Sequence, residues 1–170
     1  MLTASDKGAA GERVDSSGDV VEERLIGLGF VVERGVVPDE QPRIESALRE
    51  ASRTHDLIVT TGGTGLTPRD VTPQATLAVV DYEVPGLAEA MRASGREKTP
   101  MADLSRGVVG VIGRSLVVNV PGSPTAAIES LDAIVPALGH ALETLAGPYD
   151  HGRVATPAVA TPAPDGGPDR

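Results

Sequence analysis

The sequence predicts an α/β protein with a mostly parallel, helix-covered β-sheet and one antiparallel hairpin. Apolar runs with the length of strands alternate with segments whose apolar residues follow the helical period. In the second half, the β-rich runs Gly107–Gly113 and Leu116–Val120 are two residues apart, which is typical of a hairpin. A length of 170 residues with 40% hydrophobic content is sufficient for one domain with a core of ordinary size.

The first half of the chain is predicted to contain three strands and two helices. Met1–Ala4 is a short first strand, and the polar, glycine-rich residues 6–19 are expected to form a loop. Ser16 or Ser17 is the expected cap of a helix that ends at Gly29. The next predicted elements are a strand at Phe30–Val37, a helix at Glu40–Arg53 and a buried strand at Leu57–Val59.

A glycine-rich loop, Gly62–Gly65, follows the third strand and is the centre of the functional prediction. Its three glycines let the backbone approach a ligand and expose N–H groups, as an anion cradle requires. It is not a P-loop, since no Gly-Lys-Ser/Thr follows. An isolated glycine-rich loop of this kind is about as often a plain connection as a ligand-binding loop. Thr72 and Pro73 are expected as N-cap and first residue of the next helix, whose N-terminus also favours anions.

The second half continues with helices at Pro73–Val80 and Pro85–Ser94, followed by the hairpin. The last helix carries the clearest apolar stripe, from Ile128 to Leu145, and Pro136 should kink it. The composition then changes to Ala, Thr, Pro, Gly and Asp. We therefore expect residues 1–150 to form the α/β domain and residues 151–170 to form a disordered tail.

The composition excludes several kinds of site. Without cysteine the chain has no disulfide, thiolate metal ligand or thiol nucleophile. A net charge of -9 argues against nucleic-acid binding, which needs a basic face. No run is apolar enough to span a membrane and none has the pattern of a signal peptide, so we expect a cytoplasmic protein without a membrane partner.

Polar segments follow three of the predicted strands: Ser5-Asp6, Gly62–Gly65 and Pro121-Gly122-Ser123. The carboxyl ends of parallel strands lie at the same edge of a sheet, where ligands bind, so these segments should meet in one crevice. Ser123 is the expected N-cap of the last helix, and its hydroxyl and N–H could also serve a phosphate.

Two aspartates and two arginines are candidates for chemistry. Asp70 fits a magnesium ligand or a group that orients a phosphate-bearing substrate; the alternative is a surface residue near a helix start. Asp39 lies where the crevice would open, but capping its helix is the better interpretation from sequence alone. Arg69 and Arg106 are either phosphate clamps or solvated groups. The three histidines lack metal-ligand spacing and are interpreted as structural.

Seven segments, in order and with their spacing kept, carry a resemblance that runs from about Ser5 to Leu145. Together they resemble the molybdenum-cofactor biosynthesis family of bacterial molybdopterin adenylyltransferases, their close relatives and gephyrin-like G domains. The segments are Ser5-Asp6 with Gly11-Glu12 and Asp15-Ser16-Ser17-Gly18; Val37-Pro38-Asp39-Glu40; Ile58 to Gly65; Pro68 to Pro73; Val84-Pro85-Gly86 with Glu89; Leu104-Ser105-Arg106; and Asn119 to Pro124.

The resemblance implies a three-layer α/β/α fold, a homotrimer, and Mg²⁺-dependent transfer of an adenylyl group from ATP to molybdopterin. It also implies a molybdenum insertase as a candidate partner and a longer apolar first strand than Met1–Ala4. The implied catalytic and metal-binding carboxylates are Asp39 and Asp70. The implied substrate-binding residues are Gly62, Gly63, Thr64, Gly65, Ser105, Arg106, Pro121, Gly122 and Ser123, and the implied nucleotide-binding residues are Ser5, Asp6, Thr61 and Glu89.

Two alternatives to an adenylyltransferase remain open at this point. The first is a relative that binds molybdopterin or its precursor without efficient adenylyl transfer. The second is a regulatory nucleotide-binding module of the kind found beside catalytic domains, although no second domain is visible in the sequence. Pyrophosphate release in the presence of ATP, Mg²⁺ and molybdopterin would distinguish these functions.

Overall fold

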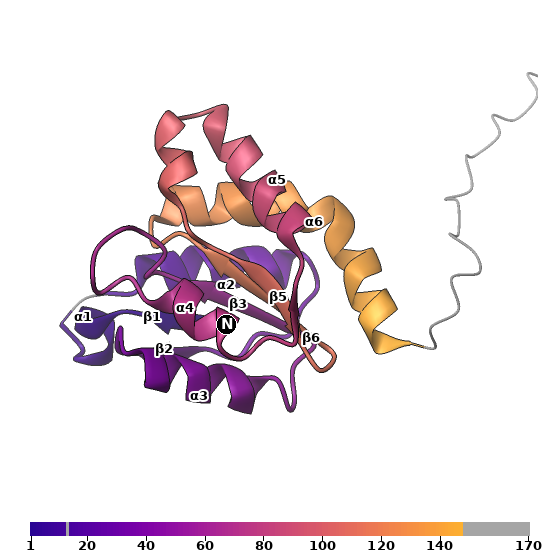
Figure 1. Ribbon diagram of the computed structural model, residues 1–170, viewed down its shortest axis with the longest axis horizontal. Helices are drawn as coiled ribbons and strands as arrows, with labels where there is room; N and C mark the ends of the chain where they lie inside the picture. The colour runs from indigo at the N-terminus through magenta and orange to yellow at the C-terminus, as the bar shows by residue number, and fades with distance from the viewer. Residues whose placement is uncertain (13, 148–170) are drawn as a thin grey trace, which may run out of the picture.

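The computed structural model describes residues 1–12 and 14–147, which form three layers with a six-stranded sheet in the middle (Figure 1). The strand order is β2-β1-β3-β6-β5-β4. The first four strands in this order run parallel; β5 pairs antiparallel with β6, and β4 with β5. This confirms the predicted sheet and its hairpin. The strands are β1 Leu2–Ala4, β2 Gly35–Val37, β3 Leu57–Thr61, β4 Tyr82–Glu83, β5 Val109–Ile112 and β6 Ser115–Val120.

Helices cover both faces of the sheet and complete the three layers. One face is covered by α2 Ser16–Gly27, α5 Pro85–Arg96 and α6 Pro124–Ala146. The other is covered by α3 Gln41–Ala51 and α4 Thr72–Leu77. Two short helical segments, α1 Asp6–Ala9 and the 3₁₀ turn η1 Pro100–Leu104, lie in connections.

A separate apolar cluster fills the space on each face. Val59 and Val118 point to the α2, α5 and α6 side, where Leu131 of α6 is fully buried. Their neighbours Ile58 and Val117 point to the α3 and α4 side. Successive strand residues face opposite ways, so a strand that is covered on both faces is apolar along most of its length. The uninterrupted apolar runs in the sequence have this cause.

The parallel strands bring four connections to one edge of the sheet. Ala4 is in register with Val37, and Thr61 is in register with Val120. The segments that follow β1, β2, β3 and β6 therefore leave the sheet side by side, as expected for a ligand-binding crevice.

The second strand is shorter than predicted, because Phe30–Arg34 form no strand. β1 begins at Leu2, which pairs with Gly35, so the preceding segment has no strand beside it. Phe30 and Val32 instead pack their side chains against the α2 and α6 core. Their β-rich composition reflects this packing.

The polar stretch after β1 contains helical structure where a loop was predicted. Asp6–Ala9 form α1, and α2 begins at Ser16. The predicted caps Ser16 and Ser17 are wrong: the N-cap is Asp15, whose side chain accepts a hydrogen bond from Gly18 N at 2.9 Å. The carboxylate accepts hydrogen bonds from Thr3, Ser17 and Arg34 as well as from Gly18 N.

Two further helix starts differ from expectation in detail. Val71 is the N-cap of α4, and Thr72 is its first helical residue, without a capping bond from either side chain. Ser123 is the N-cap of α6, as predicted, but its side chain makes no capping hydrogen bond.

The apolar stripe of α6 is a core stripe, as its spacing predicted. Leu131 and Leu138 are buried, while Leu142 and Leu145 pack against the same cluster. Pro136 lies inside the helix, whose ribbon changes direction along its length (Figure 1). Among the described helices none is both long and apolar enough to cross a membrane. The predicted tail lies outside the described residues.

Candidate active site

The connections after β1, β2 and β3 form a polar cavity of about 200 Å³ at the carboxyl edge of the sheet. Sequence reasoning expected such a crevice, and the structure brings both candidate carboxylates to it. The lining includes Ser5, Asp15, Ser16, Ser17, Asp39, Gly62, Gly63, Asp70 and Gly122.

Gly62 and Gly63 shape the floor of this cavity. Both have positive φ, +92° and +62°, which residues with a side chain rarely adopt. A Cβ on Gly62 would collide with the Ala4 carbonyl oxygen, and Gly122 packs directly against the Gly62 Cα. Glycine is therefore required here for close approach of three backbone segments as well as for the turn.

Asp6 and Asp39, of which only Asp39 lines the cavity, exchange hydrogen bonds. Asp6 N donates to Asp39 Oδ2 at 2.9 Å, and Asp39 N donates to Asp6 Oδ1 at 3.0 Å. The interpretation of Asp39 as a helix cap is wrong, because the N-cap of α3 is Glu40 and its side chain makes no capping bond. Asp39 instead links the end of β2 to the end of β1.

The environments of these two carboxylates push their pKa values in opposite directions. Burial raises the pKa of Asp39, and the negative charges of Asp6 and Asp70 add to this effect. The pKa of the exposed Asp6 is lowered, mainly by its hydrogen bonds with Arg69. Arg69 contacts Asp6 in bidentate fashion, with its Nη2 atom 2.6 and 2.7 Å from the two carboxylate oxygens. Its side chain is 58% exposed, so Arg69 is a largely solvated surface group that is held in an ion pair with Asp6.

Asp70 and Arg106 hold the glycine loop in shape. Asp70 Oδ2 accepts from Thr67 N at 2.8 Å, and a Cβ on Gly65 would lie only 3.0 Å from that oxygen. Arg106 donates through Nε to Gly65 O at 2.6 Å and through Nη2 to Asp70 O. The guanidinium binds backbone carbonyls and fixes the loop, so Arg106 is not a solvated surface group.

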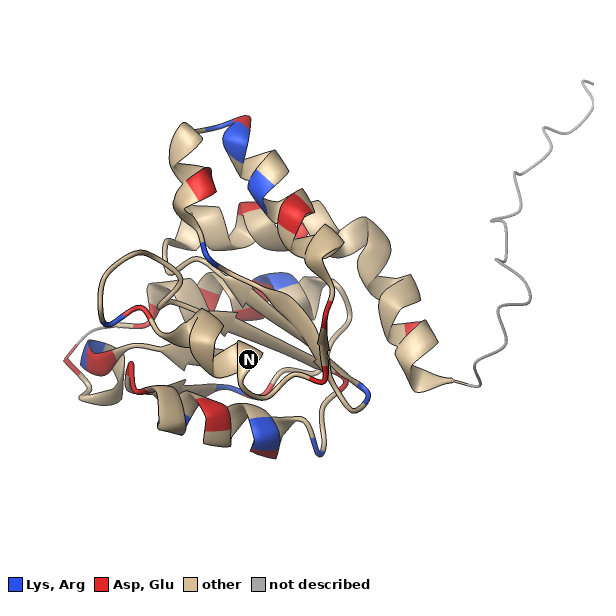
Figure 2. Cartoon of the chain, viewed as in Figure 1, with Lys and Arg blue, Asp and Glu red and all other residues tan. Residues whose placement is uncertain are grey.

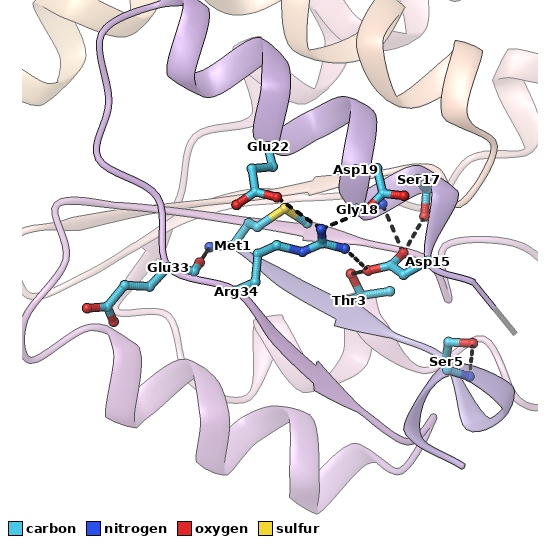
Figure 3. A network of polar contacts seen from close by, with 11 residues as sticks. Met1, Thr3, Ser5, Asp15, Ser17, Gly18, Asp19, Glu22, Glu33 and Arg34 are labelled. Carbon is cyan, nitrogen blue, oxygen red and sulfur yellow. Dashed lines mark hydrogen bonds and ion pairs between the residues drawn. The ribbon is translucent and has the colours of Figure 1, made fainter. Parts of the chain in front are cut away.

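Asp15 lines the polar cavity and holds several neighbouring groups together (Figure 3). It accepts hydrogen bonds from Thr3 Oγ1 at 2.6 Å, Gly18 N at 2.9 Å, Arg34 Nη2 at 2.9 Å and Ser17 Oγ at 3.2 Å. Burial alone would raise the pKa of Asp15, but these hydrogen bonds outweigh it and hold the pKa below its usual range.

Sequence reasoning gave Asp15 no role of its own. Its position before Ser-Ser-Gly at a helix start is a capping signal that was assigned to the serines instead. Arg34 could not be found this way, because it reaches Asp15, Asp19 and Glu22 from another segment.

A second cavity of about 280 Å³ lies on the other side of the glycine loop. Thr64 and Gly65 line it, together with Ser105, Pro121 and Asn119. Most of the remaining lining is apolar or small and comes from α5, η1 and α6; Met91, Met101, Leu104 and Ala126 are examples. The four-residue loop thus separates a polar cavity lined by carboxylates from a mainly apolar one.

Five residues expected from the resemblance are not in the lining of either cavity: Asp6, Thr61, Glu89, Arg106 and Ser123. Thr61 is buried, and its hydroxyl donates to Pro121 O at 3.0 Å, which joins the ends of β3 and β6. Glu89 is exposed on α5, whose residues Ala88 and Arg92 line the second cavity. Ser123 is exposed at the start of α6, next to Gly122 in the first cavity.

The polar cavity fits a magnesium ion that is shared with a phosphate ligand. No group of three or more His, Cys, Asp or Glu in residues 1–12 and 14–147 is arranged to hold a metal ion alone. Mg²⁺ usually takes one or two carboxylates, with water and substrate phosphate as its other ligands. Asp39 and Asp70 each have one carboxylate oxygen, Oδ1, that accepts no hydrogen bond from the described protein atoms.

Acidic residues outnumber basic residues in the sequence, 24 to 15. Figure 2 shows acidic and basic positions interspersed on the helices. This charge balance argues against nucleic-acid binding, which requires a broad basic face. A phosphate ligand would have to be held locally, by backbone N–H groups or a metal ion.

Comparison with known proteins identifies relatives over most of the chain. A family model described as "Probable molybdopterin binding domain" matches residues 1–140. The molybdopterin adenylyltransferase of Helicobacter pylori is 38% identical over 88% of each chain, and that of Haemophilus influenzae is 40% identical over 84% of this chain and 75% of its own length. The crystal structure of the molybdopterin biosynthesis enzyme MoaB from Thermus thermophilus superimposes with a TM-score of 0.81 and 53% identity, covering 88% of this chain and 96% of that one.

Proposed function

We propose that this chain, which belongs to the molybdopterin-binding domain family, transfers the adenylyl group of ATP to the terminal phosphate of molybdopterin. One observation carries the proposal: a single glycine loop separates a carboxylate-lined polar cavity from a mainly apolar cavity. Two substrates of different polarity, joined through phosphates, match this arrangement. The relatives named molybdopterin adenylyltransferase support the same assignment.

In the proposed reaction a terminal phosphate oxygen of molybdopterin attacks the α-phosphorus of ATP. A new P–O bond forms, the bond from the α-phosphorus to the bridging oxygen breaks, and pyrophosphate leaves. No covalent step is required of the protein, so positioning and charge stabilisation carry the catalysis.

The chain's own groups would position both substrates. Backbone N–H groups of Gly62–Gly65 would hold phosphate oxygens, and Arg106 keeps this loop in shape through Gly65 O. Asp39 and Asp70 would hold Mg²⁺ at the polar cavity. When bound, the ion would offset the negative charge of the phosphates. The apolar cavity beside Ser105 and Pro121 would take the pterin.

The test is a direct assay with ATP, Mg²⁺ and molybdopterin. We expect pyrophosphate and adenylylated molybdopterin in equal amounts, and no pyrophosphate when molybdopterin is omitted. Asp70→Asn should abolish the transfer, whereas the matched control Asp103→Asn, in an exposed ion pair with Arg96, should retain it. Equal turnover of both variants would contradict the assigned site.

A second candidate function is binding of molybdopterin or its precursor without efficient transfer. It is favoured by the identity of 53% with a structure whose name specifies biosynthesis but no adenylyl transfer. Tight pterin binding, measured by fluorescence or calorimetry, together with no pyrophosphate release would favour this function over the first.

The assembly and partners remain predictions. The resemblance implies a homotrimer, which light scattering coupled to size-exclusion chromatography would detect as three times the mass of the chain. A molybdenum insertase is the candidate acceptor of the adenylylated product. Co-elution of the two proteins only in the presence of that product would support this pairing.

A further inference from the structure

Thr72 carries the only buried side-chain polar atom without a hydrogen-bond partner in residues 1–12 and 14–147. The residue is fully buried at the start of α4, and its backbone N–H donates to Gly63 O at 3.2 Å. Other buried threonine hydroxyls, such as those of Thr61 and Thr76, are paired. Because an unpaired buried hydroxyl destabilises a fold, its presence beside the polar cavity calls for a functional explanation.

The Thr72 hydroxyl faces the space where Gly63 lacks a side chain. A Cβ on Gly63 would collide with Thr72 Oγ1, and the same Cβ would lie 3.3 Å from Asp39 Oδ1. The hydroxyl and the carboxylate oxygen therefore border the same small gap. Any residue other than glycine at this position would fill it.

Asp39 presents the complementary group to this gap. Its Oδ2 atom accepts from Asp6 N at 2.9 Å, whereas Oδ1 accepts no hydrogen bond from the described protein atoms. The Thr72 hydroxyl, which has no acceptor, and Asp39 Oδ1, which has no donor, thus both lie close to Gly63. In this structure no hydrogen bond joins the two groups.

We propose that Thr72 is a positioning residue for Asp39, and that its hydroxyl donates to Asp39 Oδ1 across the gap at Gly63 when nucleotide occupies the polar cavity. The inference rests on the proposed function for the identity of this ligand. With the bond formed, Asp6 N and Thr72 Oγ1 hold the two oxygens of Asp39 from different elements. The carboxylate then has one orientation toward the ligand instead of several.

Stability measurements separate this role from a structural one. Thr72→Val removes the hydroxyl and keeps the shape, and Thr72→Ser keeps the hydroxyl. Thr76→Val is the matched control, because Thr76 Oγ1 donates to Thr72 O at 2.9 Å and accepts from Asn119 at 3.0 Å. We expect Thr72→Val to melt at or above the wild-type temperature and Thr76→Val to melt below it. A Thr72→Val variant that melts as low as Thr76→Val would overturn the proposal.

Kinetics provide the second measurement. The kcat of Thr72→Val should fall about ten- to a hundredfold, which is the effect of one hydrogen bond to a charged group. The KM for ATP should change much less, and Thr72→Ser should keep most of the kcat. A wild-type kcat in Thr72→Val, or an equal loss in both variants, would overturn the inference.

A spectroscopic readout is independent of turnover. With ¹³C-labelled aspartate and Asp39→Asn for assignment, the Asp39 carboxyl resonance should move when Mg²⁺ and ATP are added to the wild type. In Thr72→Val it should reach a different final position. The same final position in both proteins, or no movement in the wild type, would refute the bond. A normal shift without any product would instead refute the proposed transfer reaction alone.

Discussion

Replacement of Asp15 by alanine tests whether one carboxylate holds the wall of the polar cavity. The side chain is only 13% exposed and connects Thr3 of β1, the first turn of α2 and Arg34. Loss of the helix cap costs about 1 kcal/mol. The hydroxyl of Thr3, a residue that is 4% exposed, loses its partner at a further cost of about 1–3 kcal/mol. The ion pair with Arg34 adds less than about 1 kcal/mol because it is partly solvated.

We therefore expect Asp15→Ala to lower the free energy of unfolding by about 2–5 kcal/mol. For a chain of this length each kcal/mol corresponds to a fall of ~2–4 °C in melting temperature. The assay is urea denaturation followed by circular dichroism, with thermal melting as the second measurement. Asp15→Asn should lose less, since its amide oxygen can still accept from Gly18 N.

A matched control and the pH dependence sharpen the test. Asp19→Ala removes another partner of Arg34, but that side chain is 56% exposed, so we expect a change below about 0.5 kcal/mol. Because the pKa of Asp15 is lowered in the folded protein, its stabilisation is present above the unfolded pKa and is lost as pH falls through the folded pKa. The difference between wild type and Asp15→Asn should thus shrink below about pH 4. Equal stability of Asp15→Ala and Asp19→Ala at pH 7 would refute this reasoning.

Three further substitutions test other parts of the site. Asp39→Asn should raise the melting temperature slightly at neutral pH, because the burial that raises the pKa of Asp39 makes its negative charge destabilise the folded state. The same variant should reduce adenylyl transfer at least about a hundredfold. Full activity of Asp39→Asn would show that Asp39 is not part of the site. Gly62→Ala should destabilise the protein by more than about 1 kcal/mol in urea titrations, because of its positive φ and its contact with Ala4; an unchanged midpoint would contradict that geometry. Ser123→Ala should weaken pterin binding more than ATP binding in calorimetry, and equal losses would argue against its assignment to the pterin side.

Local chemistry explains why much of the fold could be predicted from the sequence. Strands such as β3 and β6 are covered on both faces, so each contains a run of three consecutive apolar residues. The glycine loop was recognisable because positive φ and close backbone approach both demand glycine. The short β1 and the loss of strand structure at Phe30–Arg34 were harder to predict, since strand formation depends on a neighbouring strand.

The partners of the site residues could not be predicted in the same way. Asp39 was assigned to capping because local sequence offers α3 as its nearest partner, but its bond is to Asp6 of another connection. Arg69 and Arg106 were treated as ligand groups or surface groups for the same reason. In the structure they contact Asp6 and the glycine loop, 63 and 41 residues away.

The sequence by itself determined the helix-covered α/β sheet and the central glycine loop, because these follow from hydrophobic period and backbone conformation. Only the tertiary structure decided which groups are paired and which are free. It paired Asp6 with Asp39 and Asp15 with Arg34, and it left the Thr72 hydroxyl alone beside Gly63. A hydrogen bond depends on where two side chains meet in space, and that meeting is set by the parallel strands that bring distant connections to one edge of the sheet.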